Sequence, residues 1–222
     1  MIILHGGDEF TKGCEKIDRS ILSVKGNSSH AVVILPTAAA NQNPLKAVNN
    51  GIDYFKKFGI NAEKLMVLDN TDANNHEIVN SINNYNIIYL TGGDPDYLLY
   101  VLKDSLLIQR IKENLSKHKC ILIGSSAGAM VLGAKMWRRS LVASLGIING
   151  LVLPHYESNN LVSNNFEIIQ EFQESMPVMG IDSKTSCFYN SEKLQVIGTG
   201  KVVLFFKNEK YVLYNGQSFV IN

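Results

Sequence analysis

Short apolar runs alternate with amphipathic stretches through the first three quarters of this chain, and this pattern constrains the fold more than any other feature. Runs such as Ala31–Leu35 and Ile87–Leu90 lack polar alternation, which is typical of strands buried on both faces. Because helix-like segments lie between these runs, the pattern predicts an α/β fold whose mostly parallel sheet is covered by helices on both faces. We expect strands at residues 2–4, 31–35, 65–68, 86–90 and 120–123, and helices at 10–24, 44–58, 77–82, 95–115 (in one or two pieces) and from 127 onward.

The last quarter of the chain has a different pattern. Short apolar segments at 186–189, 194–197, 202–206 and 211–214 are separated by polar or glycine-containing turns. This spacing predicts a C-terminal antiparallel meander attached to the α/β body. With 222 residues and no repeat, low-complexity tract or linker, we expect one domain over residues 1–222, with a body of about 1–183 and a meander extension of about 184–222.

The charge balance excludes some classes of partner. There are 21 Lys and Arg residues against 20 Asp and Glu residues, so we expect neither nucleic acid nor an anionic membrane as a partner. No apolar run approaches the roughly 20 residues of a membrane span, and we see no signal peptide. The cysteines Cys14, Cys120 and Cys187 are far apart, which argues against a disulfide framework or a cysteine-rich metal site and favours a cytoplasmic location.

The strongest local motif is Gly124-Ser125-Ser126-Ala127-Gly128, which lies between an expected strand and an expected helix. It matches the G-x-S-x-G nucleophile elbow, in which a sharp turn exposes the central serine. The two glycines would let strand and helix pack closely, and the N–H of Ala127 would be one donor to an oxyanion. The alternative is a tight turn between strand and helix without any chemistry.

A second glycine turn, Thr91-Gly92-Gly93-Asp94-Pro95, follows another expected strand. It would place N–H groups at the carboxyl edge of the sheet, where open α/β sheets bind ligands. The N–H of Gly93 is a candidate second oxyanion donor, and Asp94 is a candidate substrate contact. Asp94 could equally cap the following helix, with Pro95 in its first turn, and both interpretations can hold together.

A serine nucleophile needs a base, and two histidines compete for that role. His155 emerges from the apolar segment Leu151–Pro154, downstream of the elbow, and Pro154 stiffens the approach. His5 ends the first strand and could line the same edge of the sheet. We favour His155 as the base on position alone.

Three motifs, in this order, resemble the aspartyl dipeptidase (peptidase E) and cyanophycinase family of serine peptidases: Thr91–Asp94, Gly124–Ala129 and Pro154–Tyr156. The segments Leu4–Gly7 and Gly180–Asp182 also fit the pattern, so the likeness covers most of the chain. The resemblance implies a flavodoxin-like three-layer sandwich related to class I glutamine amidotransferases, with Ser in place of their Cys. It further implies hydrolysis of peptide bonds next to aspartate without a metal or cofactor.

Carried over motif by motif, the resemblance makes Ser126 the nucleophile, His155 the base, and Gly93 and Ala127 the oxyanion donors. The third member of the triad is less clear, because no Asp or Glu lies between Ser126 and His155. Asp182 is our first choice for the acid, with a capping or turn residue as its alternative role. Glu157 and Glu192 are weaker candidates.

The expected substrate is a small peptide of the Asp-Xaa type, whose acidic side chain calls for a cation. Arg138 and Arg139 could reach the mouth of the site, or they could be solvated residues at a helix C-terminus. Tyr156 could contact the substrate or simply pack. The alternatives are an esterase or amidase of another small acyl compound and a silent ligand-binding relative, and we expect a monomer or a homodimer.

Overall fold

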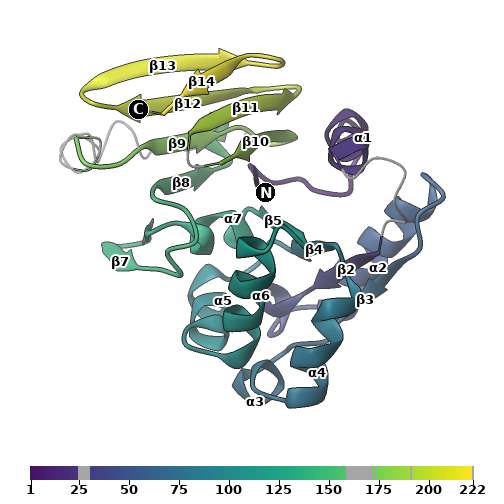
Figure 1. The fold of residues 1–222 in the computed structure, drawn as a ribbon. Helices are drawn as coiled ribbons and strands as arrows, with labels where there is room; N and C mark the ends of the chain where they lie inside the picture. Colours follow the sequence, from purple (N-terminus) through teal and green to yellow (C-terminus); the bar gives the residue numbers. More distant parts are fainter. Residues whose placement is uncertain (25–30, 159–171, 173, 191, 222) are drawn as a thin grey trace.

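The computed structural model describes residues 1–24, 31–158, 172, 174–190 and 192–221, and in this part of the chain the strands form three sheets (Figure 1). The strands are β1 (Ile2–His5), β2 (Val32–Leu35), β3 (Ala62–Lys64), β4 (Ile87–Leu90), β5 (Ile121–Ser125), β6 (Lys135–Trp137), β7 (Leu141–Ala143), β8 (Leu151–Pro154), β9 (Val178–Ile181), β10 (Thr185–Tyr189), β11 (Lys193–Gly198), β12 (Lys201–Phe206), β13 (Glu209–Tyr214) and β14 (Ser218–Val220). The helices are α1 (Glu15–Val24), α2 (Pro44–Lys56), α3 (Asn70–Ala73), α4 (His76–Ser81), α5 (Pro95–Leu102), α6 (Leu106–Ser116) and α7 (Ala127–Leu132).

The largest sheet has the strand order β14-β11-β10-β1-β5-β4-β2-β3, and β1, β5, β4, β2 and β3 run parallel. Alternate residues of one strand face opposite helical layers. In β2, Ile34 packs with Ile17 of α1 and Phe55 of α2, whereas Val33 belongs to the cluster that contains Ile111 of α6. The predicted α/β sandwich with a mostly parallel sheet is therefore confirmed.

The four strands expected in the last quarter are present, but they divide between two sheets. Strands β10 and β11 extend the large sheet beyond β1, while β12 and β13 join β9 and β8 in a four-stranded sheet. Residues of β12 explain this division, because Leu204 lies in the main core and Val203 lies in a separate cluster with Leu153. A strand that is apolar on both faces needs cover on both sides, and a flat extension of one sheet would not provide it. Figure 1 shows these green and yellow strands stacked at one end of the molecule, away from α3 and α4.

Two expected elements have different bounds. The helix expected at 10–24 begins only at Glu15, because Phe10 (φ 62°) and Gly13 (φ 107°) adopt left-handed conformations that a helix cannot contain. The strand expected at 65–68 is wrong: β3 ends at Lys64, and the Thr37 hydroxyl holds the following segment by donating to Val67 O at 2.7 Å.

The segment expected to be helical at 95–115 forms two helices, α5 and α6. The backbone of Asp104 is left-handed (φ 60°), which interrupts the helix between them. The Ser105 hydroxyl then caps α6 by accepting the N–H of Ile108 at 3.2 Å. In the part of the chain that the structure describes, no helix combines the length and apolar character needed to cross a membrane.

Candidate active site

The serine motif forms a strained turn between β5 and α7. Ser126 has φ 49° and ψ −109°, a conformation that non-glycine residues rarely adopt. A Cβ at Gly124 would lie 2.5 Å from the Gly128 carbonyl carbon, and a Cβ at Gly128 would lie 2.5 Å from Leu90 O. The glycines therefore let β5, α7 and β4 approach closely, which fixes the exposed turn that carries Ser126.

His155 is the histidine that the fold brings to this serine. Its Nε2 lies 3.1 Å from Ser126 Oγ. The backbone N–H of His155 donates to Gly6 O at 2.8 Å, and the ring lies so close to Gly7 that a Cβ there would be 2.0 Å from Cε1. The pair Gly6-Gly7, part of the segment Leu4–Gly7 that fits the family pattern, thus connects β1 to the base.

The competing histidine, His5, is fully buried behind the turn. Its Nδ1 accepts the N–H of Gly7 at 3.0 Å, and its Nε2 lies 3.7 Å from Cys14 Sγ. Burial is the main cause that lowers the pKa of His5 to about 4, so this imidazole is neutral near pH 7. His155, rather than His5, is positioned to take a proton from Ser126.

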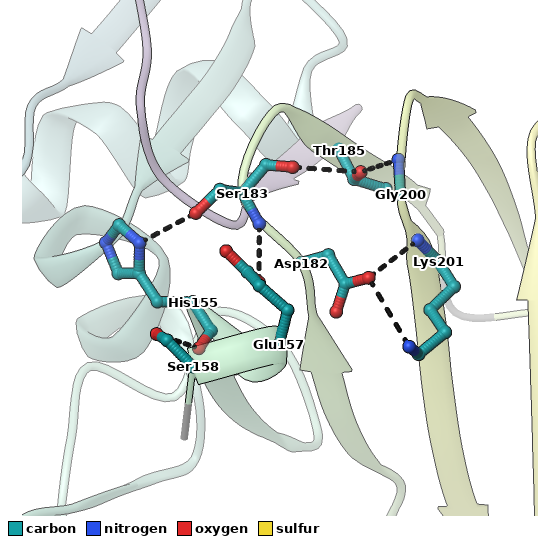
Figure 2. A network of polar contacts seen from close by, with 8 residues as sticks. All are labelled: His155, Glu157, Ser158, Asp182, Ser183, Thr185, Gly200 and Lys201. Carbon is teal, nitrogen blue, oxygen red and sulfur yellow. Dashed lines mark hydrogen bonds and ion pairs between the residues drawn. The ribbon is translucent and has the colours of Figure 1, made fainter.

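Figure 2 shows the other side of the imidazole, where the expected acid is not the neighbour. Nδ1 of His155 lies 2.9 Å from Ser183 Oγ. Asp182 instead accepts the backbone N–H of Lys201 at 3.1 Å and pairs with its ammonium at 3.8 Å. Asp182 directly follows β9 and points to the second sheet, whereas Ser183 lies in the tight turn before β10 and faces His155.

The other two acid candidates lie in different places. Glu157 accepts the backbone N–H of Ser183 at 2.9 Å (Figure 2). It therefore binds the residue whose hydroxyl lies beside the imidazole. Glu192 is exposed in the turn between β10 and β11, and no described contact joins it to His155. Ser183 was missed from sequence. The parallel pairing of β8 and β9, with Pro154 opposite Ile181, brings the residues after the two strands together, but it puts Asp182 next in register with His155 and therefore does not single out Ser183.

The expected oxyanion donors, Gly93 and Ala127, line the same cleft as Ser126. Gly93 has φ 144°, and a Cβ at this position would lie 2.2 Å from Ala38 O. Among the described residues, neither the Gly93 N–H nor the Ala127 N–H has a hydrogen-bond acceptor. An oxyanion hole requires unpaired N–H donors of this kind at the cleft that holds the serine, so Gly93 and Ala127 stay candidates for that role.

Glu9, a residue that the sequence analysis did not single out, connects the two turns. One carboxylate oxygen accepts the N–H of Gly92 at 2.8 Å, and the other accepts the Ser125 hydroxyl at 2.7 Å. Its neighbours Asp8 (φ 60°) and Phe10 (φ 62°) both have left-handed backbones, so the loop holds Glu9 at some conformational cost. No recognisable motif surrounds Glu9, and only the contacts show its position.

The cleft in front of Ser126 has a volume of about 950 Å³, and Arg138, Arg139 and Asp96 line it. The two arginines lie in the turn of the hairpin formed by β6 and β7. The interpretation that they lie at a helix C-terminus is therefore wrong. Arg138 donates from Nε to Asp96 Oδ2 at 2.9 Å, whereas Arg139 has no ion pair within the described ranges. The cleft therefore presents one paired and one unpaired guanidinium.

Two expected substrate contacts have structural roles. Asp94 caps α5 by accepting the N–H groups of Asp96 (2.9 Å) and Tyr97 (3.3 Å). Tyr156 packs its ring against Gly180, where a Cβ would lie 2.3 Å from the ring, and burial raises the pKa of its hydroxyl. Neither of these side chains lines the cleft.

Within the described ranges, no three His, Cys, Asp or Glu side chains gather as a set of metal ligands. The three cysteines are free and buried, and burial is the main cause that raises the pKa of Cys14 to about 11 and that of Cys187 to about 12. A raised pKa keeps these thiols protonated and poorly nucleophilic. Ser126 and His155 both line the cleft and are the candidates for nucleophile and base.

Both the sequence and the structure of this chain are similar to those of known proteins. A model of peptidase family S51 matches residues 1–197. The chain is similar to a cyanophycinase of Synechococcus elongatus, with 26% identity over 219 residues that cover 92% of this chain and 67% of the cyanophycinase. The structure is similar to that of a peptidase from an acI-B1 Actinobacterium, with a TM-score of 0.82, 25% identity, and coverage of 99% of this chain and 96% of that one. It shares its fold with a putative peptidase E protein from Listeria monocytogenes EGD-e, with a TM-score of 0.60, 19% identity, and coverage of 89% of this chain and 96% of that one. The chain therefore belongs to peptidase family S51.

Proposed function

We propose that this peptidase cleaves its substrate through a covalent acyl-enzyme on Ser126. The observation that carries the proposal is the 3.1 Å contact between Ser126 Oγ and His155 Nε2, on a strained turn that opens into a cleft. A serine in this setting is activated by the adjacent base, and a structural turn would need no such strain.

In the proposed reaction, His155 Nε2 takes the hydroxyl proton as Ser126 Oγ bonds to the carbonyl carbon of the substrate. The negative charge that develops on the carbonyl oxygen is stabilised by the N–H groups of Gly93 and Ala127. His155 then gives its proton to the leaving amine as the peptide bond breaks. Water, deprotonated by the same imidazole, attacks the acyl carbon. The bond between this carbon and Ser126 Oγ then breaks, His155 returns the proton to Oγ, and the acid product leaves.

We propose a small Asp-Xaa peptide as the substrate. Arg139 supports this choice, because its exposed guanidinium lines the cleft and has no ion pair among the described residues. A guanidinium binds a carboxylate with two parallel hydrogen bonds, which suits an aspartate side chain. Asp96 and Arg138 together add one charge of each sign to the same cleft.

A second candidate is a cyanophycin-type substrate, a polyaspartate backbone that carries arginine. The similarity to a cyanophycinase favours this candidate, and so does the pairing of an acidic and a basic group in the cleft. A substrate with both charges could exchange partners with Asp96 and Arg138. An esterase or amidase of another small acyl compound would use the same serine and oxyanion donors.

The test is hydrolysis of Asp-Leu, of the β-Asp-Arg dipeptide and of a simple ester by the unmodified chain and by Ser126→Ala. Ser116→Ala, an exposed serine on α6, is the matched control. We expect cleavage of at least one peptide by the unmodified chain and the control, and none by Ser126→Ala. Equal rates in Ser126→Ala would overturn the nucleophile, and cleavage of the ester alone would replace the peptide substrate.

We also propose a cytoplasmic location, which the three free, buried cysteines support. The proposed partner is the small peptide substrate, with neither nucleic acid nor membrane, and the chain acts as a monomer or a homodimer. Sedimentation of the purified protein tests the last point.

A further inference from the structure

The imidazole of His155 must present an unprotonated Nε2 to Ser126, so its proton must be held on Nδ1. Ser183 Oγ is the acceptor at that position, 2.9 Å away. A neutral hydroxyl stabilises the imidazolium less than a carboxylate would, because it carries no charge. The group to which Ser183 is itself bonded therefore affects the strength of the base.

That group is Glu157. Its carboxylate accepts the N–H of Ser183 at 2.9 Å, and Figure 2 shows it beside both Ser183 and the imidazole. Partial burial would raise the pKa of Glu157, but hydrogen bonds from the side chain and backbone of Ser183, together with the nearby His155, lower it overall. The carboxylate is thus ionised at neutral pH and bonded to the serine that contacts Nδ1.

The backbone fixes all three residues together. His155 has φ 49° and begins the short 3₁₀ turn Tyr156–Ser158, whose Ser158 donates to His155 O through its N–H (3.1 Å) and its hydroxyl (2.9 Å). This turn brings Glu157 back toward the end of β9. Because β8 and β9 are paired in parallel, the same pair of strands positions the base, the serine and the carboxylate.

Other charged or titratable groups near the imidazole have different partners. His5 on β1 is neutral near pH 7, and Asp182 after β9 binds Lys201. Ser126, at the start of α7, is the proton donor itself. Within the described residues, Glu157 is therefore the carboxylate that is bonded to Ser183.

We propose that Glu157, acting through Ser183, is the positioning acid for His155, in an inference that rests on the proposed serine-peptidase function. The Nδ1–H of His155 donates to Ser183 Oγ, and the backbone N–H of Ser183 donates to the Glu157 carboxylate, which holds Ser183 in place beside the imidazole. No bond breaks in this chain of contacts. The proton stays on Nδ1, and the carboxylate stabilises the imidazolium that forms when Ser126 is deprotonated.

The test measures the rate at which a fluorophosphonate probe labels Ser126 in the intact chain between pH 5 and 9, so that it depends on no peptide substrate. The variants are Glu157→Gln, Ser183→Ala and the double variant, with the exposed Glu192→Gln as the matched control. We expect labelling of Glu157→Gln at pH 7 to be slower by about 10- to 100-fold. Loss of the carboxylate removes a negative charge close to the imidazolium, so we expect the acidic limb of the measured pH profile to move to lower pH.

The double variant should lose no more than the worse single variant, because both changes break one chain of contacts. Thermal unfolding shows which variants remain folded, and Glu157→Gln alters an exposed residue. An unchanged rate and pH profile in Glu157→Gln, or additive losses in the double variant, would overturn the relay and leave the hydrolase standing. Absence of labelling in the unmodified chain would overturn the proposed function itself.

Discussion

Ser126 and His155 come from two different sheets, and the local sequence specifies the serine far more tightly than the histidine. The turn around Ser126 is held by Gly124, Gly128 and the end of β4, and the five-residue motif at 124–128 predicts it from the sequence. The imidazole depends on contacts with Gly6, Gly7 and Ser183, which lie 149, 148 and 28 residues away. The comparison teaches that the nucleophile is a property of one turn, whereas the base is a property of how two sheets meet.

The largest loss of activity is expected where Gly7 contacts the His155 ring. In Gly7→Ala the new Cβ would lie 2.0 Å from His155 Cε1, so the ring must leave Ser126. We expect kcat to fall by about 1,000-fold or more, as for loss of the base. Gly59→Ala is the control, because Gly59 is also left-handed (φ 74°) but has no neighbour within 4 Å of the added Cβ. Equal activity in both variants would show that the contact with Gly7 does not hold the base.

A second test measures how the free energy of unfolding depends on pH through a buried carboxylate on α1, the helix that packs on the large sheet. Asp18 on α1 is buried, and burial raises its pKa to about 7, although Tyr54 donates to it at 2.8 Å. The pKa of Asp18 is thus higher in the folded chain than its unfolded value of about 3.8, so protonation of Asp18 stabilises the folded state. This contribution to the free energy of unfolding is complete below pH 4 and is lost as the pH rises through 7. We expect Asp18→Asn to remove a pH dependence on the order of 2–4 kcal/mol, measured by urea unfolding at pH 4 to 8. A parallel pH dependence in both proteins would contradict the burial of an ionisable Asp18.

A third test removes the carboxylate that joins the Gly92 and Ser125 turns and leaves His155 unchanged. Glu9→Gln leaves only one carbonyl oxygen for two donors, the Gly92 N–H and the Ser125 hydroxyl. The turn that carries Gly93 should then be held less firmly, and we expect kcat to fall about tenfold with little change in KM. Steady-state kinetics give both values. A rise in KM at constant kcat would instead assign Glu9 to substrate binding.

The smallest effect on catalysis is expected from Asp182→Asn, which changes the neighbour of Ser183. Asp182 binds Lys201 in the second sheet, so we expect a loss of about 1 kcal/mol in the free energy of unfolding and an unchanged pH profile. Chemical denaturation and the kinetic pH profile measure the two effects separately. A shift of the acidic limb as large as that expected for Glu157→Gln would restore Asp182 as the orienting acid.

Much of the large sheet could be predicted because each element depends on nearby residues. Buried runs such as Ile87–Leu90 and helix signals such as Asp94-Pro95 specify their own conformation. The strand expected at 65–68 failed because apolar character alone does not show whether a segment finds a pairing partner. Likewise, the sequence indicated the strands of the last quarter but not their division between two sheets, which depends on what covers β12.

The candidate site divides in the same way. The sequence by itself determined the α/β layers and the elbow at Ser126, because periodicity and a glycine-bounded turn act over a few residues. Only the tertiary structure decided that Ser183 and not Asp182 meets His155, and that Glu9 bridges Gly92 and Ser125. The physical reason is that Ser183 lies in the tight turn between β9 and β10, where the path of the backbone decides which side chain meets His155. A shift of one residue along this turn would exchange a carboxylate for a hydroxyl, and the packing of β9 and β10 in their two sheets sets where the turn lies.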